Sequence, residues 1–498
     1  MPTIKIDGVD VEVEEGKTVL EACRDKGLDV PHYCYHPGLR PDGNCRMCIL
    51  KVSTSRKLEA SCMYPVSEGM EVETEGPEIE KGRKDVLEFM LANHPLDCPE
   101  CDKAGECDLQ NFTFQYRGGV SRFRENKVIK HTKDLGPNIS IWGNRCIACT
   151  RCVRFEEEVS GEGSLTLINR GDHAVIDVFP GRPIDNPISM NVVDICPVGA
   201  LISKDFLYQA RVWFAKETES VCASCARGCN VKITVLDNEI KRMKPRHNSG
   251  VNSYWMCDEG RLNTKYVASH ERVQRFKGSA EDILSNAKKI ITEHGEGSFG
   301  IVTSTYQTIE ELWLIKKLAD AWKAPVGFLT REEGEKKAYP GITIEPDKTP
   351  NRRFAEKLFG KLEGVPSGCK GLLLINGIPD YPYPSELTKA AEAAEFLAIS
   401  DILKSPLLAL AQVVLPGRTW AEKEGTFMNI DGRVQRIRPA LNAPPAAQEE
   451  ISWLQECAET EKIASAEEVF AEAAQGVPAL SDLNYSKLGN QGITANGI

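Results

Sequence analysis

The sequence predicts an α+β protein of several domains, and three observations lead to this fold class. The chain has 498 residues, which is enough for three or four domains at about 150 residues each. Sixteen of its eighteen cysteines lie before residue 271, in spaced groups. After that position cysteine is rare, and runs typical of buried strands alternate with runs typical of helices. We therefore expect small cysteine-rich domains followed by an α/β region.

The composition excludes several classes of protein. Hydrophobic residues make up 41% and charged residues 27% of the chain, as in ordinary globular proteins. The net charge of −11 and the lack of a basic run argue against nucleic-acid binding. No apolar run approaches the length of a membrane helix, roughly 18 residues, and the N-terminus lacks the pattern of a secretory signal. We therefore expect a cytoplasmic protein whose cysteines bind metal rather than form disulfides.

Residues 1–78 are predicted to form a β-grasp domain that resembles the [2Fe–2S] ferredoxins. Apolar and polar positions alternate around an Asp-Gly turn in residues 3–13, which is the pattern of a β-hairpin. Thr18 can cap a helix that runs to about Lys26 and stops at Gly27. Two strands, a helix and a cysteine-rich loop are together typical of a small mixed-sheet ferredoxin domain.

The first predicted site consists of four cysteines separated by ten, two and thirteen residues: Cys34, Cys45, Cys48 and Cys62. Four thiolates, two of them from one C-x2-C loop, can hold a [2Fe–2S] cluster. Gly38, Gly43 and Asn44 loosen the loop, so that backbone amides can turn toward the sulfur atoms and raise the reduction potential. Four cysteines also suit zinc, although the preceding hairpin and helix favour iron. The first gap is longer than in the plant-type ferredoxin pattern.

The second predicted site lies in residues 79–118, which read as a helix, a cysteine-rich turn and a second helix. Its ligands follow H-x3-C-x2-C-x5-C and are His94, Cys98, Cys101 and Cys107. A neutral histidine in place of a thiolate makes a [4Fe–4S] cluster less negative, which tends to raise its potential. Pro95 and Pro99 break the helix and let the chain wrap around the metal. The other seven histidines are not assigned to metal, and His32 and His36 are expected to pack in a loop or face solvent.

Residues 94–110 resemble a segment of the large iron–sulfur subunit of NADH:quinone oxidoreductase, which is the G subunit of bacterial respiratory complex I. The segment reads His-Pro-Leu-Asp-Cys-Pro-Glu-Cys-Asp-Lys-Ala-Gly-Glu-Cys-Asp-Leu-Gln. Iron-only hydrogenases share it, as do electron-transfer subunits of NAD-linked hydrogenases and formate dehydrogenases. The resemblance is strong over residues 1–271 and implies an electron-transfer protein.

The third predicted site, in residues 119–215, combines a C-x2-C-x2-C core with a remote Cys-Pro pair and consists of Cys146, Cys149, Cys152 and Cys196. Two-cluster ferredoxins carry a further cysteine where this chain has Glu156. One ferredoxin-like [4Fe–4S] cluster is therefore expected, which argues against an iron-only hydrogenase. Arg145, Arg151 and Arg154 lie next to these ligands. Their charge could stabilise a reduced cluster, or they could form a solvated helix face.

The fourth predicted site, in residues 216–271, follows C-x2-C-x3-C-x27-C and consists of Cys222, Cys225, Cys229 and Cys257. This spacing resembles the [4Fe–4S] domain of molybdopterin oxidoreductases, and zinc is again the alternative. Catalytic molybdenum enzymes tend to place a basic residue soon after the last cysteine. Asp258 and Glu259 stand there instead, so an active molybdenum site is not expected.

Residues 272–440 are expected to be a shortened, cofactor-free α/β region of molybdopterin-oxidoreductase type. Its predicted strands are 300–304 and 371–376, and its predicted helices are 309–322 and 385–397. Residues 413–416 and 424–435 resemble a loop segment of the molybdopterin fold. Residues 441–498 are expected to form a helical C-terminal tail that is loose from about Gly489.

Several features of the sequence are predicted to have no functional role. Gly295, Gly297 and Gly300 fit G-x-G-x-x-G but follow a helix and precede a strand, so we interpret them as a turn rather than a dinucleotide loop. Three isolated cysteines are interpreted as buried thiols, and they are Cys23, Cys369 and Cys457.

The resemblance implies one [2Fe–2S] and three [4Fe–4S] clusters on sixteen iron ligands, with no molybdopterin, flavin or NAD bound by this chain. It implies a subunit of an NADH dehydrogenase that does not itself bind NADH. Its partners would be a flavin- and NADH-binding subunit and quinone-side iron–sulfur subunits of a hetero-oligomeric complex. The chain would pass electrons from flavin towards quinone, on the inner face of a bacterial cell membrane through its partners. The second and third sites would lie on the main electron path, whereas the sequence leaves open whether the fourth lies on it or is an off-path remnant.

Three other functions remain open from the sequence. The same set of clusters can serve a soluble NAD-linked hydrogenase, a formate dehydrogenase or a ferredoxin-linked complex. A catalytic molybdenum enzyme and a zinc scaffold without redox activity are the other two. Each predicts a different metal content or a different set of associated subunits.

Overall fold

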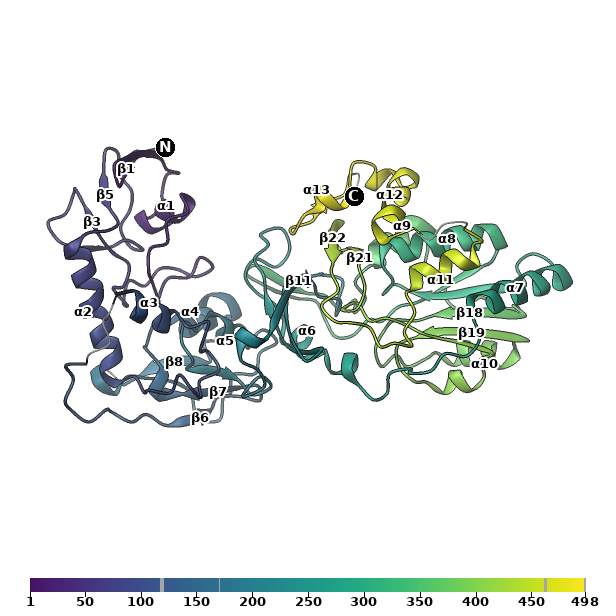
Figure 1. Ribbon diagram of the computed structural model, residues 1–498, viewed down its shortest axis with the longest axis horizontal. Coiled ribbons are helices and arrows are strands. Elements are labelled where there is room, and N and C mark those ends of the chain that lie inside the picture. Colours follow the sequence, from purple (N-terminus) through teal and green to yellow (C-terminus); the bar gives the residue numbers. More distant parts are fainter. Residues whose placement is uncertain (117–120, 170, 461–463, 497–498) are drawn as a thin grey trace. The chain divides into compact units, whose positions relative to one another are not determined.

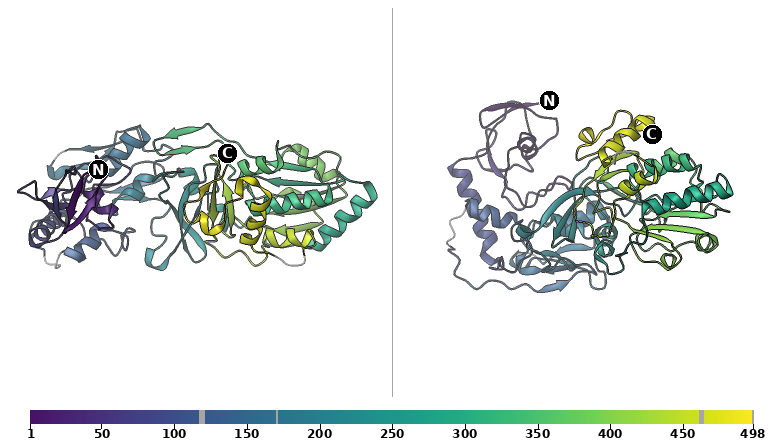
Figure 2. Two further views of the ribbon diagram at one scale, coloured as in Figure 1. Left: turned by 90° about the horizontal axis from the view of Figure 1, so that it is seen from above. Right: turned by 45° about the vertical axis from the view of Figure 1, so that its right-hand side comes forward.

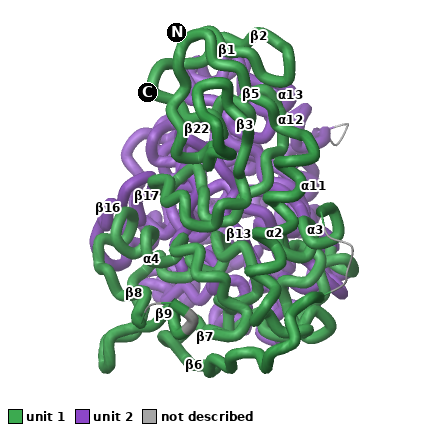
Figure 3. Tube along the Cα trace, turned by 90° about the vertical axis from the view of Figure 1, so that its left-hand side faces the viewer, with its two compact units in different colours: residues 1–215 green, residues 216–498 purple. Residues whose placement is uncertain are grey.

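The structure is a computed structural model that describes residues 1–116, 121–169, 171–460 and 464–496. It divides into two compact units, Met1–Ala215 and Lys216–Ile498 (Figure 3). Each unit contains a hydrophobic core of its own. No helix among the described residues is long and apolar enough to cross a membrane.

The first unit begins with a five-stranded mixed sheet in the order β2-β1-β5-β3-β4. Its strands are β1 (Thr3–Ile6), β2 (Val9–Glu12), β3 (Ile49–Val52), β4 (Glu59–Ala60) and β5 (Glu71–Glu73). The predicted hairpin is confirmed, because Asp7 and Gly8 have positive φ angles between the antiparallel β1 and β2. The predicted helix is confirmed as α1 (Val19–Asp25), where Thr18 and Glu21 form a capping box. Its buried face packs on the sheet and closes the core.

The remainder of the first unit consists of short elements between the cysteine loops (Figure 1). The helices are α2 (Pro77–Asn93), α3 (Asp108–Tyr116), α4 (Arg151–Phe155) and α5 (Asn191–Ile195). A three-stranded sheet contains β6 (Thr132–Asp134), β7 (Ile139–Trp142) and β10 (Leu201–Ser203), and a hairpin contains β8 (Leu165–Ile168) and β9 (Val175–Val178). The predicted order of helix, cysteine-rich turn and helix is confirmed by α2 and α3, although residues 117 and 118 lie outside the described residues.

The second unit opens with an antiparallel sheet of β11 (Lys216–Val221), β12 (Asn230–Leu236) and β13 (Glu239–Pro245), followed by the short α6 (Asp258–Leu262). A parallel sheet follows in the order β15-β14-β18-β19-β20. Its strands are β14 (Phe299–Ser304), β15 (Val326–Leu329), β18 (Gly371–Ile375), β19 (Phe396–Asp401) and β20 (Val413–Pro416). These strands are almost entirely buried, because helices cover both faces of the sheet.

Helices lie on both sides of this sheet, with α7, α8 and α11 on one face and α10 on the other (Figure 1). The helices are α7 (Ala280–His294), α8 (Ile309–Trp322), α9 (Arg352–Phe359), α10 (Ser385–Ala393), α11 (Glu450–Cys457), α12 (Ala466–Gly476) and α13 (Tyr485–Leu488). Helix α11 packs against both α7 and α8 (Figure 2). Small antiparallel pairs complete the unit: β16 (Lys337–Tyr339) with β17 (Ile342–Ile344), and β21 (Gly425–Met428) with β22 (Arg433–Ile437) and β23 (Ile493–Thr494).

Three details differ from the sequence-based expectations. The helix expected over residues 385–397 ends at Ala393, because the residues from Phe396 onward form the fully buried strand β19. The segments expected to form a loop, 413–416 and 424–435, are largely strands β20, β21 and β22, paired through backbone hydrogen bonds. The C-terminal end is not loose up to residue 496, because β23 pairs with β22 and the Arg433 guanidinium binds the Gly492 carbonyl at 2.9 Å.

The glycine motif at residues 295–300 is a turn, as predicted. Gly295 ends α7, Gly297 has a φ of 81°, and Gly300 lies inside β14. The glycines therefore lie before the strand rather than between a strand and the start of a helix.

Candidate iron–sulfur sites

The first site gathers its four cysteines in the interior of the N-terminal domain. All four side chains are buried, and hydrogen bonds link Cys34 to Cys45 and Cys62, and Cys62 to Cys48. The Cys34 backbone N–H donates to the Cys45 sulfur at 3.4 Å. The Cys34 sulfur accepts hydrogen bonds from the backbone of Cys45 and Asn44, as expected for a loop that turns its amides toward thiolates. Hydrogen bonds from Cys45 and Cys62 lower the pKa of the Cys34 thiol.

The second site is the most open of the four. Cys98 is exposed, Cys107 is half-buried and Cys101 is buried. His94 stands at the C-terminal end of α2, where burial lowers its pKa to about 4. The imidazole is therefore neutral near pH 7 and can offer a lone pair to a metal. Burial raises the pKa of Cys107 to about 11, while backbone hydrogen bonds from Gln110 and Leu109 to its sulfur act in the opposite direction.

Two residues that the sequence did not single out fix the Cys101 loop. A Cβ atom at Gly199 would lie 2.1 Å from the Cys101 sulfur, so only glycine allows this approach. Arg211 donates to the Cys101 carbonyl at 2.7 Å. Gly199 follows the Cys196-Pro197 pair of the third site closely in the sequence, and this proximity was the signal that could have found it.

The third site brings its remote cysteine to the other three. All four cysteines line one small pocket, whose apolar wall includes Ile141, Ile176 and Leu201. Burial raises the pKa of Cys146 to about 11 and that of Cys149 to about 12. The Ala148 N–H donates to the Cys146 sulfur at 3.4 Å. Such thiols become thiolates only where a cation compensates for the burial of their charge.

The three arginines beside the third site do not form a solvated helix face, and that alternative is wrong. Arg145, Arg151 and Arg154 are 2%, 8% and 7% exposed. Arg151 and Arg154 donate to backbone carbonyls, and Arg145 pairs with Asp97 at 3.0 Å. They are buried because loops far apart in the sequence pack over them.

The fourth site lies in the second unit at the start of α6. All four cysteines are buried, and burial raises the pKa of Cys222 to about 11. Cys257 caps α6, and its sulfur accepts the Gly260 N–H at 3.2 Å. A Cβ atom at Gly260 would lie 3.1 Å from the Cys222 sulfur and 3.2 Å from that of Cys257. The backbone of α6 therefore lies close against two thiols.

The surroundings of the predicted ligands fit iron–sulfur clusters. A cluster spreads its ligands over several iron atoms. Buried thiols, amide hydrogen bonds to sulfur and closely approaching glycines are the environment that such a cluster needs.

The cysteines and histidines that the sequence did not assign to metal differ in how deeply they are buried. Cys23 and Cys457 are buried, but Cys369 is half-exposed, so the interpretation as a buried thiol is wrong for Cys369. Its loop lies at the surface before β18, and its sulfur is 3.7 Å from the Gly297 carbonyl. His32 and His36 pack in the loop around Cys34, where the His36 ring accepts the Gly38 N–H at 3.1 Å.

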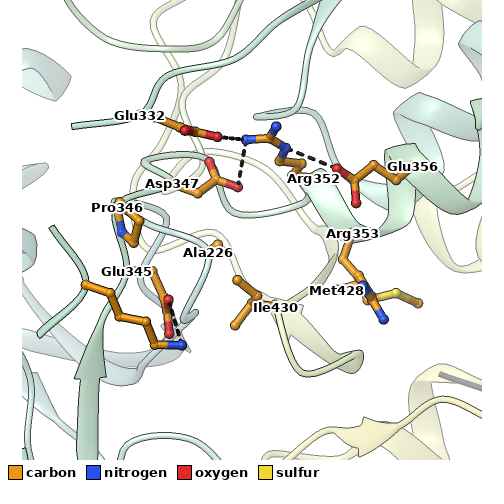
Figure 4. Close-up of a pocket in the computed structure, with 11 residues that line it drawn as sticks. Ala226, Glu332, Glu345, Pro346, Asp347, Arg352, Arg353, Glu356, Met428 and Ile430 are labelled. Atoms are coloured by element: carbon orange, nitrogen blue, oxygen red, sulfur yellow. Dashed lines mark hydrogen bonds and ion pairs between the residues drawn. The ribbon is translucent and has the colours of Figure 1, made fainter. Parts of the chain in front are cut away.

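A polar pocket lies beside the fourth site, between the loop after Cys225 and the start of α9 (Figure 4). Its charged side chains pair with one another: Lys336 with Glu345 at 3.5 Å, and Arg352 with Glu356 at 3.2 Å. Neither cysteine nor histidine is among its lining residues.

Five protein-family descriptions match consecutive parts of the chain. They are the 2Fe-2S iron-sulfur cluster binding domain (residues 1–77), the NADH-ubiquinone oxidoreductase-G iron-sulfur binding region (83–122), the ferredoxin-like domain of NADH-quinone oxidoreductase subunit 3 (136–202), the molybdopterin oxidoreductase Fe4S4 domain (215–269) and molybdopterin oxidoreductase (365–460). Together with the mixed sheets and helices, these matches confirm the predicted α+β multidomain fold class. They also support a 2Fe-2S cluster and 4Fe-4S clusters.

Curated relatives show which proteins the chain resembles over most of its length. The G subunit of the NADH-quinone oxidoreductase of Rickettsia prowazekii is 45% identical over 321 residues, which are 63% of this chain and 48% of that one. The chain is a relative of these G subunits. The NADH-ubiquinone oxidoreductase 78 kDa subunit of Neurospora crassa is 44% identical over 354 residues, covering 68% of this chain and 47% of that one. The chain thus spans about half the length of the curated G-subunit relatives that it matches. A chain of an NAD+-reducing [NiFe]-hydrogenase structure matches 42% of this chain and 91% of its own length, with a TM-score of 0.40 and 29% identity.

Proposed function

We propose that this G-subunit relative transfers electrons from an NADH-reduced flavin in a partner subunit toward quinone. The observation that carries the proposal is the contact between sites in the first unit. The Arg154 guanidinium donates to the carbonyls of Cys34 and Cys149, which belong to the first and third sites. Gly199, beside the last ligand of the third site, lies against the sulfur of Cys101 in the second site. Three redox sites in direct succession suit an electron-transfer chain rather than a structural scaffold.

The proposed cofactors are one [2Fe–2S] cluster at the first site and one [4Fe–4S] cluster at each of the other three. When bound, such clusters exchange electrons one at a time, which lets a two-electron donor feed one-electron acceptors. The predicted cysteines would supply thiolates and the neutral His94 ring a nitrogen. Backbone N–H groups at Ala148 and Gly260 already point at sulfur atoms and would stabilise negative charge there.

The proposal assigns no molybdopterin, flavin or NAD to this chain. Asp258 and Glu259 follow the last ligand of the fourth site, and Glu259 pairs with Lys348 at 2.6 Å. An acidic start to α6 does not offer the basic link to a pterin that we expect of a molybdenum enzyme. We further propose that the six segments bounded at residues 78, 118, 215, 271 and 440 are the domains of the chain.

The proposed partners are a flavin- and NADH-binding subunit and quinone-side iron–sulfur subunits, through which the chain would sit peripherally on the inner face of the cell membrane. The test is to purify the native complex through a tag on this chain, identify its subunits and add NADH anaerobically. We expect those partners to co-purify and NADH to reduce the iron–sulfur signals in electron paramagnetic resonance (EPR) spectra. Co-purified hydrogenase or formate dehydrogenase subunits, or signals that NADH cannot reduce, would overturn the proposal.

A further inference from the structure

Two junctions hold the cysteine loops of the first unit together. At the first-to-third junction, the loop before Cys45 packs on residues 148–158. Thr150 donates to Asp42 at 2.7 Å, and Arg40 pairs with Glu158 at 3.1 Å. At the second-to-third junction, Asp97 and Arg145, which directly precede Cys98 and Cys146, form an ion pair at 3.0 Å. Each junction therefore joins the segments that carry the ligands of two sites.

Buried guanidinium groups occupy the first-to-third junction. Arg154 donates through one nitrogen to the Cys34 carbonyl at 2.5 Å and to the Cys149 carbonyl at 3.3 Å. Arg151 donates to the Tyr35 carbonyl at 2.6 Å and to the Ile195 carbonyl at 3.0 Å, next to Cys34 and Cys196. Both guanidinium groups donate to carbonyl oxygens. Because a carbonyl group carries no net charge, these hydrogen bonds do not neutralise the positive charge of the arginines.

Arg145 occupies the second-to-third junction, where the Asp97 carboxylate partly compensates its charge. Its guanidinium lies 4.0 Å from the centre of the Trp142 ring, and its Cδ would lie 3.8 Å from a Cβ atom at Gly199, the residue that contacts the Cys101 sulfur. Its Nη2 atom is buried and has no hydrogen-bond partner among the described residues. An unpaired N–H at this position is free to donate to a group that the protein itself does not supply.

We propose that these arginines are positioning residues shared between sites: Arg151 and Arg154 raise the reduction potentials of the first and third sites together, and Arg145 raises those of the second and third. The inference rests on the proposed function, since it requires clusters on the predicted ligands. Reduction adds one negative charge to a cluster, and a nearby cation stabilises the reduced form. Because these guanidinium groups are buried, salt screens them much less than it screens surface charges.

The test uses redox titrations of the full chain in its complex, followed by EPR. We expect Arg151→Gln to lower the midpoint potentials of the first and third sites, which makes the ratio of reduced to oxidised cluster about tenfold smaller at a fixed solution potential. Arg145→Gln should do the same to the second and third sites and leave the first unchanged. Arg151→Lys keeps the charge and should restore most of the shift.

Two further variants show whether a shift in midpoint potential depends on an arginine that lies between two sites. Arg182→Gln removes the same charge from an exposed side chain of the same unit and should move no midpoint. If Arg151→Gln loses its clusters, Arg154→Gln repeats the test at the same junction. A shift confined to one site, equal shifts at every site, no shift, or a lysine variant that shifts as far as the glutamine variant would overturn the inference. Absence of iron–sulfur signals from the unmodified protein would instead overturn the proposed function.

Discussion

Replacing Gly199 with alanine is expected to remove the cluster of the second site while leaving the other three in place. The added Cβ would lie 2.1 Å from the Cys101 sulfur and 3.2 Å from the Cβ of Lys103. Non-bonded atoms of this size prefer a separation of about 3.5–4.0 Å. The sulfur would therefore have to move by about 1.5 Å, which is most of a metal–thiolate bond of about 2.3 Å.

The Cys101 loop cannot retreat freely from the new methyl group. Arg211 holds the Cys101 carbonyl at 2.7 Å, and the Asp102 carboxylate accepts the Tyr208 N–H at 3.1 Å. Overpacking in such a place lowers the stability of the folded state by about 1–3 kcal/mol. The loss of one cluster ligand is the larger effect. The unit should therefore stay folded, and the chain should lose about four of its roughly 14 iron atoms and one [4Fe–4S] signal.

Two matched glycines calibrate this expectation. Gly260→Ala places its Cβ at 3.1 Å and 3.2 Å from two sulfur atoms of the fourth site, where a shift of a few tenths of an ångström suffices, so that cluster should remain. Gly364→Ala meets no atom within 4 Å and should change nothing. Iron analysis and EPR of the three variants check the series. A Gly199→Ala protein with full iron content and unchanged spectra would refute the reasoning.

Further predictions concern stability and metal content. Glu310 is buried, and burial raises its pKa from 4.5 to about 7. Between these two pKa values the native state holds a proton that the unfolded state has lost, so the free energy of unfolding should fall by roughly 3 kcal/mol as pH rises through this window. Urea unfolding at several pH values measures this dependence. A Glu310→Gln variant with the same pH dependence would contradict the prediction. Arg272→Met should destabilise the second unit by about 3–5 kcal/mol in the same assay, because it leaves the buried Glu422 without its partner at 2.9 Å; a loss below 1 kcal/mol would count against it. Cys257→Ser should remove about four iron atoms by elemental analysis, whereas Cys369→Ser should remove none.

Local sequence patterns predicted the elements that local interactions determine. The β1–β2 hairpin follows from its Asp-Gly turn, and α1 follows from the Thr18 capping box. The start of α10 was predicted correctly, but its end was not. Residues 385–397 contain neither a glycine nor a proline that would stop a helix. The strand from Phe396 forms because β18 and β20 pair with it on both sides, and propensity cannot show such pairing.

The cysteine spacings predicted candidate ligands, but the environment of those ligands depends on packing between distant segments. Arg154 and the Cys34 carbonyl are 120 residues apart, and Gly199 follows Cys101 by 98 positions. No local pattern indicates that a charged residue on a short helix will be buried, and the closeness of Gly199 to Cys196 in the sequence does not indicate that it will touch the sulfur of Cys101. The sequence left the arginines open between two roles for this reason, and it did not single out Gly199.

The most direct test of the central claim is a count of iron and acid-labile sulfide in the purified protein, joined to low-temperature EPR after reduction. The account predicts about 14 iron and 14 sulfide atoms per chain, with the signals of one [2Fe–2S] and three [4Fe–4S] clusters. A colourless protein that contains stoichiometric zinc and neither iron nor sulfide would contradict it.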